Sequence, residues 1–125
     1  MTEITNVRQK NICKCCKNLE EWMTLPDNVY IGRHGRIFIG SVKNNDRKIY
    51  HYKGFIWLNP YPVKTYGLDA SILMYETYIR EKIETEPDKY DLLSLKWKTL
   101  GCWCKPNKCH GDILIKLLDE LYPTV

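Results

Sequence analysis

The chain has 125 residues, of which 44% are hydrophobic, and a formal net charge of +4 from 19 basic and 15 acidic residues. This length suits one hydrophobic core and is too short for two, so we expect a single domain over residues 1–125. An apolar run of about 18 residues and an N-terminal signal segment are both absent from the sequence. We therefore expect an intracellular, cytoplasmic protein with no membrane partner. The mild charge argues against the dense basic surface of a dedicated nucleic-acid binder.

The first half of the chain predicts strands. A short strand is expected over residues 4–8, then a connection with one helical turn near 18–23, then a buried strand over 28–33. Alternating apolar residues over 35–42 and 47–55, separated by the turn sequence KNND, predict an antiparallel hairpin. The segment 55–62 contains Pro60 and Pro62 and is expected to be a strand end or a loop.

The second half predicts mainly helices. A helix over 67–84, capped by Asp69 or Ser71, carries one apolar stripe made of Ile72, Tyr75, Ile79 and Ile83. A shorter helix over 87–98, a strand over 99–104 and an amphipathic helix over 111–123 follow, the last with Ile113, Leu117 and Leu121 in register. This order predicts an α/β (or α+β) fold with a mixed β-sheet and an inserted β-hairpin, flanked by about three helices.

The densest group of reactive residues is CWCKPNKCHGD, residues 102–112. On a strand, Cys102 and Cys104 would share one face, while Cys109 and His110 stand where the last helix begins. The six cysteines form two clusters in the sequence, at 13–16 and 102–109, a pattern that argues against a secreted disulfide framework. The loop joins a strand end to a helix N-terminus, where α/β folds place anion and substrate sites.

Three interpretations of this loop stay open. As a zinc site it offers four ligands, Cys102, Cys104, Cys109 and His110, although the spacing differs from paired C-x-x-C knuckles. As a catalytic loop it places Cys104 or Cys109 near a helix N-terminus, which lowers the pKa of a thiol. However, His110 occupies the position where phosphate-binding cysteine loops need an arginine. As ordinary structure, the cysteines, Cys102 above all, are small buried hydrophobic residues and His110 caps the helix.

His110 and Asp112 are the strongest functional candidates in the loop. Both can face a ligand held by the free backbone N–H groups at Gly111 and Asp112. His110 can exchange a proton near neutral pH, which suits a general acid or base. We therefore predict His110, Asp112 and Cys104 as catalytic candidates.

Four segments in this order, NVR, VYIGR, WLNPY and LGCWCKPNKCHGDIL, resemble a family called domain of unknown function 4326. Its members occur in bacteria, phages and large DNA viruses, and the resemblance covers nearly the whole chain. Leu58 and Tyr61 stand where members usually have glycine and phenylalanine. Segments 11–27 and 34–55 look like insertions relative to short members. Cys13, Cys15 and Cys16 are then expected in an exposed loop outside any site that the family shares.

The resemblance implies one pocket formed by Arg33, Asn59, Cys104, His110 and Asp112. Arg33 follows a strand and Gly32, so its guanidinium can grip a phosphate or a carboxylate, or pair with a surface glutamate. Asn59 is held extended by the following proline, so its side-chain amide can either form hydrogen bonds with a ligand or only stabilise the turn.

These observations leave two main functional hypotheses. The first is a protein, enzymatic or not, that binds a nucleotide-like or other phosphorylated small ligand at the strand ends through Arg33, Asn59 and Gly111. The alternative is a zinc-stabilised viral or phage accessory protein that binds nucleic acid or a protein partner through the Tyr/Lys hairpin. A structural protein that inherited the domain without its chemistry is a third hypothesis.

Overall fold

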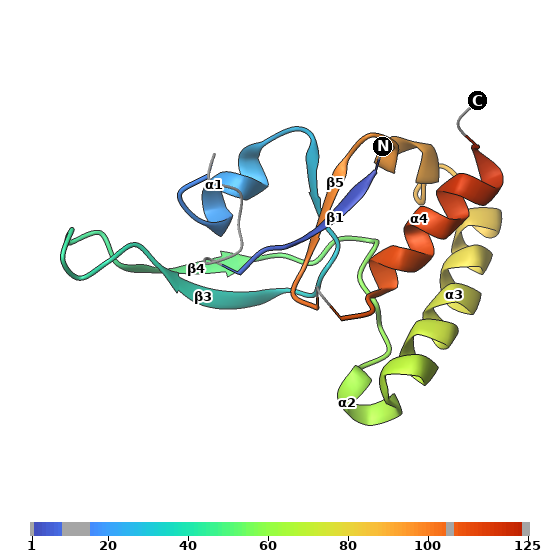
Figure 1. Cartoon of the computed structure of the whole chain (residues 1–125), viewed down its shortest axis with the longest axis horizontal. Coiled ribbons are helices and arrows are strands. Elements are labelled where there is room, and N and C mark those ends of the chain that lie inside the picture. Colours follow the sequence, from blue (N-terminus) through green and yellow to red (C-terminus); the bar gives the residue numbers. More distant parts are fainter. Residues whose placement is uncertain (1, 9–15, 105–106, 124–125) are drawn as a thin grey trace.

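A computed structural model describes residues 2–8, 16–104 and 107–123, and a short parallel sheet stands at its centre (Figure 1). The sheet contains β1 (Glu3–Asn6), β5 (Thr99–Cys102) and β2 (Asn28–Tyr30), in the order β1-β5-β2. A separate hairpin pairs β3 (Gly35–Ile39) with β4 (Lys48–Tyr52) in antiparallel register. The predicted α/β class with parallel and antiparallel strands is confirmed, and the two kinds of pairing are divided between two sheets.

Helices and the hairpin cover the two faces of the parallel sheet. The helices α3 (Leu68–Thr85) and α4 (His110–Leu121) lie on one side, while α1 (Leu19–Thr24) and the hairpin lie on the other (Figure 1). The central strand β5 serves both faces because successive side chains point to opposite sides. Leu100 and Cys102 enter the cluster under α3 and α4, whereas Trp103 packs against the cluster under α1.

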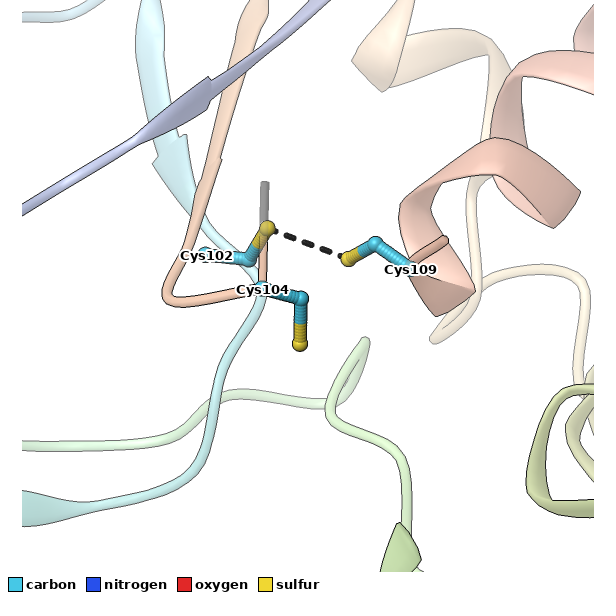
Figure 2. A group of neighbouring side chains, drawn as sticks. All are labelled: Cys102, Cys104 and Cys109. Atoms are coloured by element: carbon cyan, nitrogen blue, oxygen red, sulfur yellow. Dashed lines mark hydrogen bonds between the residues drawn. The ribbon is translucent and has the colours of Figure 1, made fainter. Parts of the chain in front are cut away.

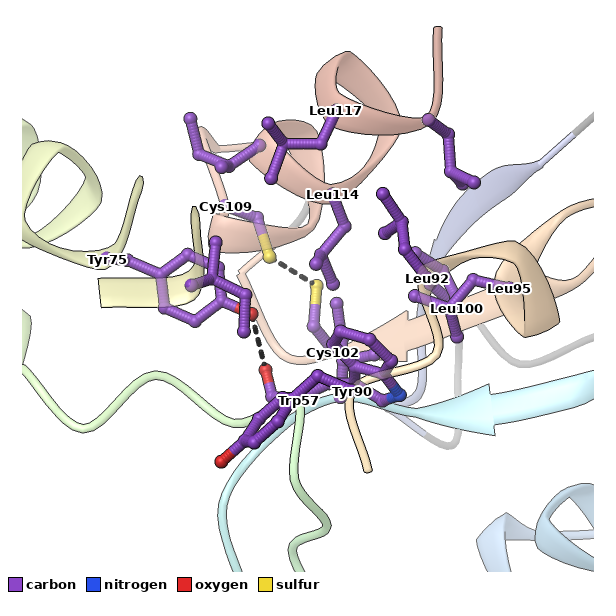
Figure 3. Close-up of a cluster of buried hydrophobic side chains, with 14 residues drawn as sticks. Trp57, Tyr75, Tyr90, Leu92, Leu95, Leu100, Cys102, Cys109, Leu114 and Leu117 are labelled. Atoms are coloured by element: carbon purple, nitrogen blue, oxygen red, sulfur yellow. Dashed lines mark hydrogen bonds between the residues drawn. The ribbon is translucent and has the colours of Figure 1, made fainter. Parts of the chain in front are cut away.

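The larger core cluster lies between the sheet and the helices α3 and α4 (Figure 3). The predicted stripe of α3 is confirmed: Tyr75 and Ile79 are fully buried, and Ile72 and Ile83 pack against the same cluster. The Tyr75 hydroxyl donates a hydrogen bond to the Trp57 backbone oxygen at 2.9 Å. This bond fixes the loop before α2 (Val63–Tyr66) to the middle of α3. Within the described residues, no helix is both long and apolar enough to cross a membrane.

The predicted helix over 87–98 is wrong. The segment contains only one 3-10 turn, η1 (Leu92–Leu95), whose first and last residues are buried. A spacing of three matches the 3-10 period, so one turn places both leucines in the core. Trp97 then adopts a left-handed φ of 69°, which breaks any continuation toward β5. The short helix α2 after Pro62 was not predicted.

Several predicted details also need correction. The strand β5 ends at Cys102 instead of 104, and Leu121 is 49% exposed while Leu118 takes the buried position. Neither Asp69 nor Ser71 caps α3, whose N-cap is Gly67 with no side-chain hydrogen bond.

The structure describes only part of the first cysteine cluster, residues 13–16. Cys16 is buried with the α1 cluster, in contrast to the exposed position that we expected, and Cys13 and Cys15 lie outside the described residues. The described part of segment 11–27 holds α1, and segment 34–55 holds the hairpin. Their status as insertions stays a prediction.

Gly101 tests the packing of the central strand. A Cβ at this position would overlap the Trp22 ring and lie 2.6 Å from Val7 Cγ1. Both neighbours are buried, so we expect Gly101→Ala to lower the free energy of unfolding by about 1–3 kcal/mol through overpacking. Urea denaturation measures the loss, with Leu73→Ala on the exposed side of α3 as a control that should change little. An unchanged midpoint for Gly101→Ala would show that the strand and α1 are farther apart.

Candidate functional site

The candidate site lies where the parallel strands β2 and β5 end. The carboxyl ends of adjacent parallel strands lie at the same edge, which is where open α/β sheets bind ligands. A pocket of about 370 Å³ opens at this edge. Its lining residues are Tyr30, Gly32, Arg33, His34, Tyr52, Asn59, Tyr61, Pro62, Val63, Lys64, Cys102, Trp103, Cys104 and His110. We call it the strand-end pocket. It brings together Arg33, Asn59, Cys104 and His110, as predicted, but Gly111 and Asp112 are not in its lining.

Three aromatic side chains form one wall of the strand-end pocket. The Tyr30 hydroxyl accepts a hydrogen bond from the Trp103 indole at 2.9 Å and donates one to the Arg33 backbone oxygen at 2.6 Å. The Tyr52 ring lies 5.5 Å from the Tyr30 ring and 5.6 Å from the Trp103 ring, measured between centroids. Burial raises the pKa of Tyr30 well above its usual value, so its hydroxyl stays neutral and keeps its donor proton. Sequence reasoning missed this wall.

Arg33 is held at the rim of the pocket by a backbone carbonyl. Its Nε and Nη2 donate to the Asn59 oxygen at 2.9 and 2.8 Å. These bonds use two of the five N–H groups of a guanidinium, and the side chain remains exposed at the pocket. The group is therefore oriented before any ligand arrives, and donors remain for an anion.

The side chain of Asn59 stabilises the turn that presents this carbonyl. Its Oδ1 accepts a hydrogen bond from the Tyr61 amide at 2.9 Å, and its Nδ2 donates to Ser71 Oγ at 2.9 Å. Ser71 Oγ in turn donates to the Tyr61 backbone oxygen. Asn59 is only 8% exposed, so its amide serves the turn and reaches the site through its backbone oxygen.

The charged groups that line the pocket are all basic. Arg33 and Lys64 carry positive charge, His34 also lines the pocket, and no aspartate or glutamate belongs to the lining of the pocket among the described residues. Lys64 and His34 are exposed, so their side chains are free to approach a bound molecule. The basic side chains favour the approach of anions, and the aromatic wall of the same pocket offers a surface for a flat ring.

A cluster of three sulfurs, which we call the sulfur triad, borders the pocket through two of its members, Cys102 and Cys104. Cys102 ends β5, Cys104 follows it, and Cys109 is the N-cap of α4 (Figure 2). Their Sγ atoms all lie within 4.8 Å of one another, and the Cys102–Cys109 distance is 3.0 Å. Hydrogen bonds with the two neighbouring thiols and burial raise the pKa of Cys109, so without a cation it remains a protonated thiol. Three soft ligand atoms at this spacing could hold a metal ion.

His110 is held beside the sulfur triad by three contacts. Its Nε2 lies 2.6 Å from the Ile31 backbone oxygen, which can only accept, so this nitrogen carries the proton. The other ring nitrogen, Nδ1, lies 3.7 Å from Cys109 Sγ, and the Tyr75 ring packs edge-on against the imidazole at 4.9 Å. Burial lowers the pKa of His110, so the ring is neutral at neutral pH.

Asp112 and Gly111 belong to the first turn of α4. The Asp112 carboxylate accepts a hydrogen bond from the Cys109 amide at 3.1 Å and closes a capping box. The Gly111 amide donates to Cys109 Sγ at 3.4 Å, and the Asp112 amide donates to the Cys109 oxygen at 2.9 Å. The backbone donors that we expected to be free for a ligand are therefore bonded within the turn.

Comparison with known proteins identifies the family. The family described as domain of unknown function (DUF4326) matches residues 9–120. The chain belongs to this family. Its relatives include "Uncharacterized protein R718" of Acanthamoeba polyphaga mimivirus, 34% identical over 98 residues, which covers 72% of this chain and 65% of that protein. No solved structure matches the chain.

A phage protein is a second relative. It is the "Uncharacterized 12.4 kDa protein in nrdA-td intergenic region" of Enterobacteria phage T4, 32% identical over 72 residues. The match covers 57% of this chain and 67% of the phage protein, whereas the chain spans just under two thirds of the mimivirus protein. One relative is a mimivirus protein and the other a phage protein, in line with the viral and phage members that the sequence resemblance implied.

Asn59 offers a test of how the rim of the pocket is built. Asn59→Ala removes the bonds to the Tyr61 amide and Ser71 Oγ, so we expect a loss of about 1–3 kcal/mol in the free energy of unfolding. Urea denaturation measures this loss, and Asn107→Ala at an exposed position is the control. Equal stability of the two variants would show that the Asn59 side chain does not support the turn.

Proposed function

We propose that the protein binds a small phosphorylated ligand with a flat ring, such as a nucleotide, in the strand-end pocket. The observation that carries this proposal is the pairing of an all-basic rim, Arg33 and Lys64 with His34, with the aromatic wall of Tyr30, Tyr52 and Trp103. The position at the carboxyl ends of parallel strands supports it. The volume of about 370 Å³ falls within the range of small-molecule sites.

Arg33 is the residue that holds the phosphate in this proposal. Its guanidinium is already oriented by the Asn59 oxygen, so little side-chain entropy is lost when an anion binds. Lys64, which lines the same pocket, supplies a second positive charge. The ring of the ligand packs against Tyr52 and Trp103, where stacking adds affinity with little selectivity among bases.

The role of His110 in this proposal is that of a neutral acceptor or base in the lining of the pocket. Its Nε2 proton is committed to Ile31, so only Nδ1 can receive a proton from a ligand or a water. Asp112 acts through the capping box, in which its carboxylate holds the backbone amide of Cys109, the residue before His110. The geometry accounts for binding without a chemical reaction. The experiment below therefore measures binding.

Arg33→Ala is expected to raise the dissociation constant for adenosine monophosphate about 10- to 100-fold, because charge-assisted hydrogen bonds to the phosphate are lost. Isothermal titration calorimetry measures the change. Arg36→Ala removes a nearby exposed arginine that is not among the lining residues, and we expect it to bind like the unmodified protein. A panel of nucleoside monophosphates and inorganic phosphate completes the experiment, and failure of the unmodified chain to bind any of them would reject the proposal.

A zinc-stabilised accessory protein is the second candidate, and the sulfur triad is the observation that favours it. This candidate also predicted that the tyrosines and lysines of the hairpin contact nucleic acid, and their positions in the structure fit that prediction less well than the sequence suggested. Tyr50 and Tyr52 pack inward against the α1 cluster, and Lys48 pairs with Glu20 at 2.9 Å. The exposed ring on the outer face is Phe38, 63% exposed, with the Arg47 guanidinium 4.3 Å from its centroid.

Phe38 therefore tests the accessory role. If the hairpin binds single-stranded nucleic acid, Phe38→Ala should reduce retention on single-stranded DNA, because base stacking contributes about 1–3 kcal/mol per aromatic contact. Retention should also fall steeply with salt concentration. The exposed Leu73→Ala variant on α3 is the control. A protein that passes through the column at low salt leaves this candidate without support.

A further inference from the structure

We propose that the sulfur triad binds one thiophilic divalent cation, Zn²⁺, and that the fourth coordination position of this ion opens into the strand-end pocket. The metal and the pocket would then form one site, in which the cation contacts the bound molecule. The proposed function enters this inference at one point only, because it says which molecule occupies the fourth coordination position. The metal site itself rests on the sulfurs.

The arrangement of the three sulfurs fits a tetrahedral ion. Zinc–sulfur bonds of about 2.3 Å place two thiolates of a tetrahedron about 3.8 Å apart. The three Sγ atoms lie within 4.8 Å of one another, and the closest pair, Cys102 and Cys109, is 3.0 Å apart. Side-chain adjustments of about 1 Å therefore bring all three to bonding distance. Two of the ligands come from rigid elements, the end of β5 and the N-cap of α4.

The surroundings of Cys109 favour a metal-bound thiolate. The Gly111 amide already donates to Cys109 Sγ, and the N-terminus of the twelve-residue helix α4 favours negative charge at this atom. Three thiols packed together resist ionisation without a cation, but Zn²⁺ displaces their protons and neutralises most of the charge. Binding would release up to three protons and would leave the site with a net charge of about −1.

The fourth position is the point that separates a structural site from a reactive one. His110 Nδ1 lies 3.7 Å from Cys109 Sγ, yet the ring nitrogens of His110 are outside the group of ligand atoms that all lie within 4.8 Å of one another. The bond from Nε2 to the Ile31 oxygen holds the ring in this place. Cys102 and Cys104 both line the strand-end pocket, so the remaining position faces that space.

A zinc ion with three protein ligands and an exchangeable fourth position is the arrangement of catalytic sites, whereas structural sites are closed by four protein ligands. The fourth ligand here would be a water molecule or an oxygen of a phosphate whose other oxygens contact Arg33. This assigns the sulfur triad and Arg33 to opposite ends of one anionic group. A metal-bound water at this position would have a lowered pKa.

The metal is tested first, by elemental analysis of the full chain purified without chelator and then dialysed against Zn²⁺. We expect about one zinc per chain. Cys104→Ser is expected to reduce the bound zinc at least tenfold, and Cys104 is the half-buried member of the triad, so this variant disturbs the core least. Cys16→Ala, a buried cysteine in the other cluster, should retain the metal. Circular dichroism establishes that both variants fold.

The open position is tested by replacing zinc with Co²⁺ and recording visible absorption. Azide is expected to shift the d–d bands because it can occupy the exchangeable position, and this outcome does not depend on whether nucleotides bind. Adenosine monophosphate or inorganic phosphate should shift the same bands if the proposed function is correct. His110→Gln, whose side-chain amide can still donate to the Ile31 oxygen, should leave the spectrum of the azide-free protein unchanged.

Several results would overturn the inference. Absence of zinc, or a Cys102–Cys109 disulfide found by mass spectrometry in the freshly purified protein, would remove the metal site. A cobalt spectrum that is unchanged by azide but changes in His110→Gln would show a closed site with His110 as the fourth ligand. If azide shifts the bands while calorimetry detects no binding of nucleotide or phosphate, the metal inference stands and the proposed function fails.

Discussion

The candidate site depends on the contact between the first turn of α4 and the carboxyl ends of β2 and β5. The hydrogen bond from His110 Nε2 to the Ile31 oxygen ties the helix to the end of β2. Gly111 allows the close approach, since a Cβ there would lie 2.8 Å from Ile31 Cδ1 and 2.9 Å from Ile4 Cδ1. Because the turn is this close to the sheet, Cys109 reaches Cys102 across the gap between helix and strand (Figure 2). The sulfur triad is a consequence of that approach.

The electrostatics of the pocket follow from the same arrangement. Cys102, Cys104 and the neutral imidazole of His110 line the same pocket as the basic side chains of Arg33 and Lys64. Without a metal, the raised pKa of Cys109 keeps that thiol neutral, and the positive charge of the pocket comes from Arg33 and Lys64. With Zn²⁺ bound to three thiolates, the metal site would carry a charge of about −1, which the two basic residues exceed. The pocket therefore attracts anions in both states, and only the metal-bound state offers a Lewis acid.

The sequence predicted the location of the site better than the chemistry of its residues. The family resemblance implied one pocket for Arg33, Asn59, Cys104 and His110, and these residues meet where the parallel strands β2 and β5 end. The side chain of Asn59 and the amides of Gly111 and Asp112 are used by local hydrogen bonds, which spacing alone does not reveal. The aromatic wall was missed because alternation does not say which face of a strand meets which neighbour. The prediction of a helix over 87–98 was wrong for a related reason: tertiary packing of Leu92 and Leu95 outweighed the local helix propensity, and local sequence does not show tertiary packing.

The hairpin adds a further level of selection to the pocket. Arg33, Asn59 and the sulfur triad all lie outside segment 34–55, whereas Tyr52 and His34 belong to it. If that segment is an insertion, as the resemblance to shorter members predicts, then the groups that we propose to bind phosphate and metal are the part that relatives share, and the hairpin adds an aromatic ring to the lining of the pocket. The Tyr52 ring packs edge-on against Tyr30 and at a tilted angle against Trp103, and these contacts fix the hairpin ring at the end of the sheet. The shared groups would then bind the anion, and the hairpin would decide which ring accompanies it.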